Sequence, residues 1–174
     1  NFTTSTDGFN VAIGHEAGAA VTTGVNNTLI GGLAGDALTD ADSNVAVGKF
    51  ALSTDTLGSK SVAIGTGALF TQNFTTATES NNTAVGHNAG VAVTTGVRNT
   101  IIGSLAGDGL TTADDSTLVG YGAGGAAMTG HDNTAVGMDS LAANTSGNNN
   151  TAVGKAAGAA VTTGINNTLI GGSA

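Results

Sequence analysis

The chain has 174 residues, a formal net charge of −8 and only 9% charged and 3% aromatic residues, where an average globular domain has about 25% charged residues; this composition argues against an enzyme. The four Lys and Arg residues are scattered, which argues against nucleic acid or an anionic membrane surface as a partner, because both bind clustered basic residues. Without cysteine there is no disulfide and no cysteine-bound metal or cofactor, and no apolar run is long enough to insert into a membrane.

Ten glycines recur along the chain at nearly equal intervals. The spacing is 17 residues in eight of the nine steps and 21 residues between Gly65 and Gly86. A fixed period of this length is typical of a solenoid, in which each repeat forms one coil and neighbouring coils stack. We therefore predict an all-β parallel β-roll of about ten 17-residue coils, one of them with 21 residues. The glycines are Gly14, Gly31, Gly48, Gly65, Gly86, Gly103, Gly120, Gly137, Gly154 and Gly171.

Each of these glycines closes a short segment rich in β-branched residues. The first is residues 10–14, the fifth residues 82–86 and the last residues 167–171. The alternation of residue types predicts strands of about five residues, stacked in parallel from coil to coil. Asn occupies the position four before the glycine in eight coils, and Ser61 and Ser116 occupy it in the others. Stacked Asn side chains can form a hydrogen-bonded ladder, although Asn and Ser also simply favour turns.

Two apolar rows follow from the strand period. The residue directly before the glycine is predicted to fill the roll core: Ile13, Ile30, Val47, Ile64, Val85, Ile102, Val119, Val136, Val153 and Ile170. The residue two before it points to the opposite face and is predicted to line the axis of a trimer: Ala12, Leu29, Ala46, Ala63, Ala84, Ile101, Leu118, Ala135, Ala152 and Leu169. So narrow a roll buries little apolar surface alone, and a threefold bundle would cover the second row.

A longer repeat of four coils divides the chain. Its units span approximately residues 1–72, 73–140 and 141–174, the last being partial. Residues 1–174 are predicted to form a single solenoid segment without capping repeats at either end, and we expect it to belong to a longer fibre. The four additional residues of the long coil fall between Leu69 and Asn82, where an outward loop carrying Phe70 and Phe74 is expected.

Candidate chemical sites are few. His15, His87 and His131 are too widely separated along a rod to share a metal, so no metal site is expected. The acidic segments 36–42 and 108–115 are interpreted as solvated turns, with Ca²⁺ binding as the alternative. A row of threonines eight residues after the glycine supports a rival hypothesis, in which a regular hydroxyl array binds ice or a glycan. Its members are Thr22, Thr39, Thr56, Thr94, Thr111, Thr145 and Thr162.

The repeat motif resembles a known class of fibrous proteins. Residues 10–14 (NVAIG) and 61–65 (SVAIG) resemble the head repeats of YadA-like trimeric autotransporter adhesins. The longer form in residues 133–149 is similar to the repeat shafts of phage tail fibres and large surface proteins of aquatic bacteria. The resemblance implies a left-handed trimeric β-roll that lies outside the cell or on a virion. No family binding residue can be placed on this chain.

The expected function is therefore that of a structural and adhesive segment of an extracellular trimeric fibre. Such a fibre, a surface adhesin or phage tail fibre, mediates attachment to a host or surface. Its partners would be copies of itself and an unidentified protein or glycan receptor, with no cofactor. The alternatives are an ice- or glycan-binding β-solenoid and a subunit of a homopolymeric extracellular filament.

Overall fold

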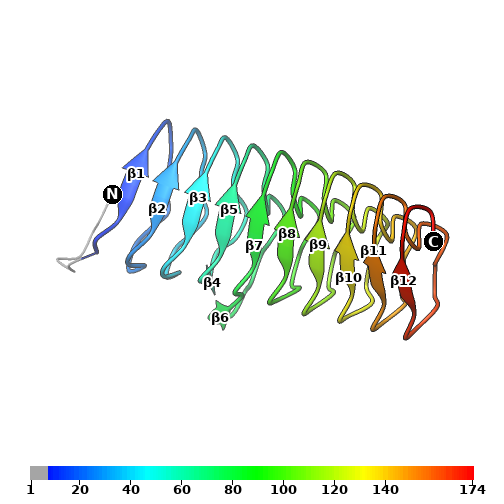
Figure 1. Ribbon diagram of the computed structural model, residues 1–174. Helices are drawn as coiled ribbons and strands as arrows, with labels where there is room; N and C mark the ends of the chain where they lie inside the picture. The colour runs from blue at the N-terminus through cyan, green and yellow to red at the C-terminus, as the bar shows by residue number, and fades with distance from the viewer. Residues whose placement is uncertain (1–7) are drawn as a thin grey trace.

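The computed structural model describes residues 8–174 as a parallel β-solenoid of about nine turns, with strands roughly 17 residues apart (Figure 1). This confirms the predicted all-β parallel solenoid. Ten strands form one sheet in the order β1-β2-β3-β5-β7-β8-β9-β10-β11-β12. They are β1 (Val11–Ile13), β2 (Thr28–Ile30), β3 (Val45–Val47), β5 (Val62–Ile64), β7 (Thr83–Val85), β8 (Thr100–Ile102), β9 (Thr117–Val119), β10 (Thr134–Val136), β11 (Thr151–Val153) and β12 (Thr168–Ile170). The first seven residues of the first predicted super-repeat lie outside the described residues.

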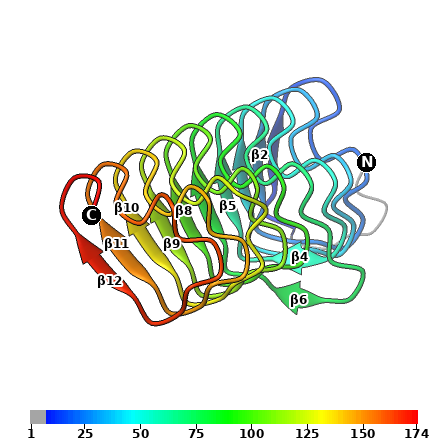
Figure 2. The same ribbon diagram turned by 90° about the vertical axis from the view of Figure 1, so that its right-hand side faces the viewer.

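The strands are three residues long, shorter than the predicted five, and turns occupy most of each coil (Figure 2). Each strand pairs with the same positions of the next coil, so that Thr134 lies opposite Thr151 and Val136 opposite Val153. The 21-residue coil keeps this register, because β5 pairs with β7 from Val62 opposite Thr83 onward. Its additional residues instead form β6 (Thr78–Glu79), which pairs in parallel with β4 (Gly58–Ser59) in a second, small sheet.

The two apolar rows lie on the opposite sides of the strand from those predicted. In the row assigned to a trimer axis, the eight residues from Leu29 to Ala152 are no more than 1% exposed and form the interior of the coil. In the row assigned to the roll core, Ile13 is 59%, Ile102 41% and Ile170 71% exposed. Alternation along a strand separates the two faces but does not reveal which one turns inward. The row that mixes alanine with Leu and Ile fills the narrow interior, and the uniformly β-branched row points outward.

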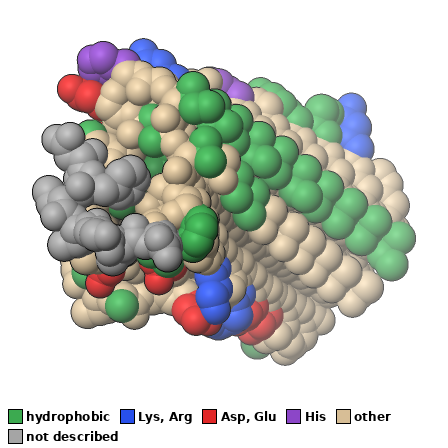
Figure 3. All heavy atoms as spheres, turned by 90° about the vertical axis from the view of Figure 1, so that its left-hand side faces the viewer, with side chains coloured by type: hydrophobic (Ala, Val, Ile, Leu, Met, Phe, Trp, Pro, Cys, Tyr) green, Lys and Arg blue, Asp and Glu red, His purple; other side chains and the backbone are tan. Residues whose placement is uncertain are grey.

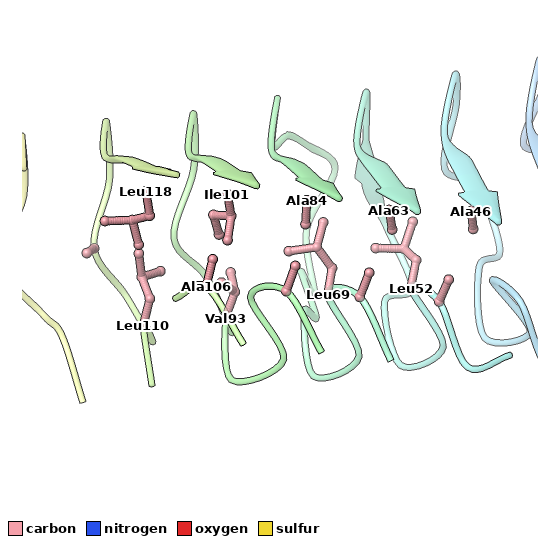
Figure 4. Close-up of a cluster of buried hydrophobic side chains, with 14 of the residues drawn as sticks. Ala46, Leu52, Ala63, Leu69, Ala84, Val93, Ile101, Ala106, Leu110 and Leu118 are labelled. Atoms are coloured by element: carbon pink, nitrogen blue, oxygen red, sulfur yellow. The ribbon is translucent and has the colours of Figure 1, made fainter. Parts of the chain in front are cut away.

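The interior is filled by complementary large and small side chains. Across from the strands, Leu52, Leu69, Val93 and Leu110 face the inner row formed by Ala46, Ala63, Ala84, Ile101 and Leu118 (Figure 4). Where the strand contributes a large residue to the interior, the residue four positions after the repeat glycine is a second glycine. A Cβ on Gly35 would lie 2.7 Å from Cδ2 of Leu29, and one on Gly124 would lie 2.8 Å from Cδ1 of Leu118. In each coil, the strand residue two before the repeat glycine and the turn residue four after it thus have room for about one large side chain between them.

The predicted asparagine ladder is present, and it runs inside the solenoid. The Oδ1 of Asn27, for example, accepts a hydrogen bond from the backbone N–H of Asn44 at 2.9 Å, one coil further on. Its Nδ2 donates to the carbonyl of Ala41 at 2.7 Å. The same two contacts recur at Asn44, Asn99 and Asn150. Each Asn therefore satisfies two backbone groups of the following coil that are shielded from water.

Substitution of Asn99 by alanine is expected to lower the free energy of unfolding by about 3 kcal/mol, because two buried backbone groups lose their partners. These groups are the N–H of Ser116, 3.0 Å from Oδ1, and the carbonyl of Ala113, 2.8 Å from Nδ2. Chemical denaturation followed by circular dichroism measures the change. Asn73→Ala is the control, since the Asn73 side chain is exposed and accepts a hydrogen bond only from the hydroxyl of Thr56. Equal effects of the two substitutions would contradict a structural role for the ladder.

Candidate interaction surfaces

The outer face of the ten-stranded sheet carries an exposed apolar stripe. It consists of the Ile and Val residues directly before the repeat glycines, one from every strand. Figure 3 shows hydrophobic side chains following one another along this side of the rod. The exposed members are Ile13, Ile64, Ile102, Val153 and Ile170, and the others are half-buried. A continuous exposed apolar stripe usually marks an interface.

A second row on the same face lies three residues before the glycine. It consists of Val11, Val45 and Val62 in three of the first four coils and of threonine in the other seven coils. Within residues 8–174, none of these threonine hydroxyls makes a hydrogen bond to the protein. The threonines are Thr28, Thr83, Thr100, Thr117, Thr134, Thr151 and Thr168. The face is therefore a regular array of methyl groups with free hydroxyls along one edge.

In the threonine row of the rival ice- or glycan-binding hypothesis, most hydroxyls bond to the neighbouring coil. Thr39 donates its hydroxyl proton to the carbonyl of Thr56 at 3.1 Å, and Thr145 donates to the carbonyl of Thr162 at 3.1 Å. Thr22 and Thr94 make the equivalent contact with the following coil. These hydroxyls tie neighbouring coils together, and their protons are not available to an external ligand.

The additional residues of the long coil form a shelf, defined here as residues 75–79, that overhangs the edge of the rod. Its residues 75–77 are exposed, and β6 at its end is fastened to β4. The expectation that Phe74 would project is wrong, because Phe74 is only 6% exposed. Phe70 is half-buried and packs edge-to-face on Phe50, with ring centroids 5.9 Å apart. Thr75, Thr76 and Ala77 therefore project from the rod, and the aromatic rings pack against it.

A hollow of about 390 Å³ opens beneath the shelf. Its charged lining consists of Asp40, Asp42, Lys60 and Glu79. The ammonium group of Lys60 lies 2.6 Å from Glu79 Oε1 and so joins the body of the rod to the shelf. The remaining lining is Ser59, Ala77 and Thr78.

The three histidines lie in separate coils, and His131 lies beside the acidic segment 108–115. Within the described residues, no group of three or more His, Asp and Glu side chains is arranged to hold a metal ion. Asp115 forms a two-pronged ion pair with Arg98, at 2.6 and 2.7 Å, and these hydrogen bonds lower the pKa of the Asp115 carboxyl. His131 accepts a hydrogen bond at Nδ1 from the backbone N–H of Asp114 at 3.0 Å. In the second acidic segment, burial raises the pKa of Asp108.

The part of the chain that the structure describes contains no helix with the length and apolar character needed to cross a membrane. Comparisons with protein-family models, with curated proteins and with solved structures gave no significant match. The surfaces of the rod itself are therefore the features from which its function can be inferred.

Proposed function

We propose that the chain is a structural and adhesive segment of an extracellular trimeric fibre, a surface adhesin or a phage tail fibre, and has no enzymatic role. The observation that carries the proposal is the apolar stripe of Ile and Val on the outer face of the sheet. Three chains packed through this face, each a left-handed roll, would share one axial core. The resemblance of residues 10–14 and 61–65 to adhesin head repeats agrees with this arrangement.

The position of the stripe supports self-association of this kind. It runs parallel to the rod axis and recurs once per coil, so identical chains can bury it along their whole length without a change of register. Large β-branched side chains left in water are unfavourable, and removal of apolar surface from water contributes about 25 cal/mol per Å². The internal ladders of each rod would resist bending, as a fibre requires. Attachment through repeated weak sites would gain strength from threefold symmetry.

Light scattering of the folded chain tests the proposal, with a mass of three times 16.5 kDa as the expected result. The variant Ile102→Lys, in the middle of the stripe, should dissociate the trimer to folded monomers. An unpaired charge buried in an interface costs about 3–5 kcal/mol. Thr76→Lys adds the same charge to the exposed shelf and should remain trimeric. A wild-type chain that is monomeric and folded would overturn the proposal.

A second candidate function, ice binding, is favoured by the free hydroxyls of the threonines on the same face. Parallel strands repeat these hydroxyls about every 4.8 Å, and the neighbouring methyl groups would help to order water between them. This function requires a monomer, because a trimer would cover the face. If the wild-type chain proves monomeric, its uptake into a growing ice front would support ice binding, and its exclusion from the ice would contradict it. The variant Thr117→Lys should lower that uptake, whereas Thr111→Lys, in the row bonded to the next coil, should not.

A further inference from the structure

The interior of the solenoid becomes polar at one place, directly beside the shelf. The side chains of Asp55, Gln72, Ser61, Ser80 and Asn82 are all fully buried there. Asp55 and Gln72 occupy the position seven residues after the repeat glycine. The same position holds an aliphatic side chain in five other coils: Val21, Leu38, Val93, Leu110 and Val161.

The side chain of Asp55 accepts hydrogen bonds from three donors. One lies in its own coil, and two lie in the long coil that follows. Its Oδ1 accepts hydrogen bonds from the backbone N–H groups of Gly58 and Phe74, both at 3.0 Å. Its Oδ2 accepts a hydrogen bond from Nε2 of Gln72 at 2.6 Å. Among the described residues, no Lys, Arg or His forms an ion pair with this carboxylate. The two oxygens of Asp55 are therefore held by hydrogen-bond donors of the backbone and of Gln72.

Gln72 extends the network to the other end of the shelf. It donates to the hydroxyl of Ser61 at 2.9 Å, and its Oε1 accepts from Nδ2 of Asn82 at 2.9 Å. The hydroxyls of Ser61 and Ser80 share a further hydrogen bond, and Ser80 donates to the carbonyl of Ser59 at 2.9 Å. Phe74 precedes the shelf and Ser80 follows it, so the network holds the chain where it leaves the rod and where it returns.

Stability of the rod does not account for these polar residues. A buried carboxylate without a cation is unfavourable, and replacement of buried polar groups by well-packed apolar ones is often neutral or stabilising. The coils with Leu or Val at this position need no such network. The polar pair occurs where the extra residues must be fastened, which points to the shelf as the reason for it.

We propose that Asp55 and Gln72 act as a clamp that holds the shelf, and the hollow beneath it, in a single conformation. The clamp works within one chain and is independent of the oligomeric state of the rod. It gives the rod one rigid projection of defined shape, in place of a loose loop. Without the clamp, the rod would keep its coils and its register, and the shelf would exchange among many conformations.

The double variant Asp55→Leu/Gln72→Leu tests the clamp. It gives both coils the residue type that Leu38 and Leu110 provide at the same position in other coils. The rod should remain folded, with a lower free energy of unfolding because the buried N–H groups of Gly58 and Phe74 lose their acceptor. Exchange of the Thr78 and Ser80 amides, which bond to the carbonyls of Leu57 and Ser59, should accelerate at least about tenfold, since opening no longer breaks the network. The amides of Thr100 and Thr117 in the main sheet should keep their rates. Unchanged exchange at Thr78 and Ser80, or acceleration throughout the sheet, would overturn the proposal.

Two further variants make the test specific. Asn144→Leu alters the other fully buried polar residue at this coil position, whose side chain bonds only within its own turn and to Met128. The shelf amides should exchange at the wild-type rate in this control. Ser80→Ala removes one arm of the network with little change in volume, and shelf exchange should accelerate while the rod remains folded. Wild-type shelf exchange in Ser80→Ala would count against the clamp.

Discussion

Gly103→Ala is expected to destabilise the chain by about 4 kcal/mol. Gly103 has φ +134°, a backbone conformation that residues with a Cβ rarely adopt. An added Cβ would also lie 2.5 Å from the carbonyl oxygen of Gly120 in the next coil. Stacked glycines meet in the same way at Gly14 and Gly137. The period of 17 residues therefore reflects a place where two backbones approach too closely for a side chain.

Alanine substitutions at two further glycines separate the destabilisation caused by an unfavourable φ from the destabilisation caused by a steric clash. Gly171 has φ +129°, but a Cβ there would meet nothing nearer than Ala174 at 3.9 Å. Gly32 has no positive φ, and its nearest contact would be the carbonyl oxygen of His15 at 3.9 Å. Denaturant unfolding should rank the alanine variants with Gly103 most destabilised, Gly171 intermediate and Gly32 unchanged within about 0.5 kcal/mol. Equal losses at Gly103 and Gly171 would show that the close approach is unimportant.

The second large effect is expected from an exchange of large and small residues inside one coil. Leu69→Gly should cost about 3 kcal/mol by leaving a cavity. Ala63→Leu should cost about 2 kcal/mol by overfilling the same space. The double variant should be more stable than either single variant, because it reproduces the arrangement of Leu118 and Gly124 in another coil. It also removes the left-handed backbone strain at Leu69, where φ is +51°.

A double-mutant cycle on unfolding free energies measures this coupling, with about 3 kcal/mol expected in favour of the pair. Ala63→Leu combined with Leu141→Gly is the matched control. Leu141 occupies the same coil position in a distant layer, so the two changes should simply add. Additivity in both cycles would mean that the layers do not share a fixed volume.

The position of the shelf was predictable, but its shape was not. The step of 21 residues between Gly65 and Gly86 places the additional residues in one coil. Which of them project depends on Asp55 in the preceding coil, whose carboxylate binds the N–H of Phe74. No local pattern around Phe74 indicates that its ring turns inward. The interaction reaches across 19 residues of sequence and exists only once the coils have stacked.

The sequence alone determined the solenoid, its parallel register and the asparagine ladder. A constant period brings identical positions into contact when coils stack, so the spacing of Gly14, Gly31 and their successors was sufficient. The tertiary structure decided which strand face turns inward, and with it which apolar row is exposed on the outside of the rod. In the turns of the coils, residues such as Leu33, Arg98 and Leu105 take a left-handed backbone conformation. These residue types rarely adopt that conformation, so the sequence carries no local sign of it.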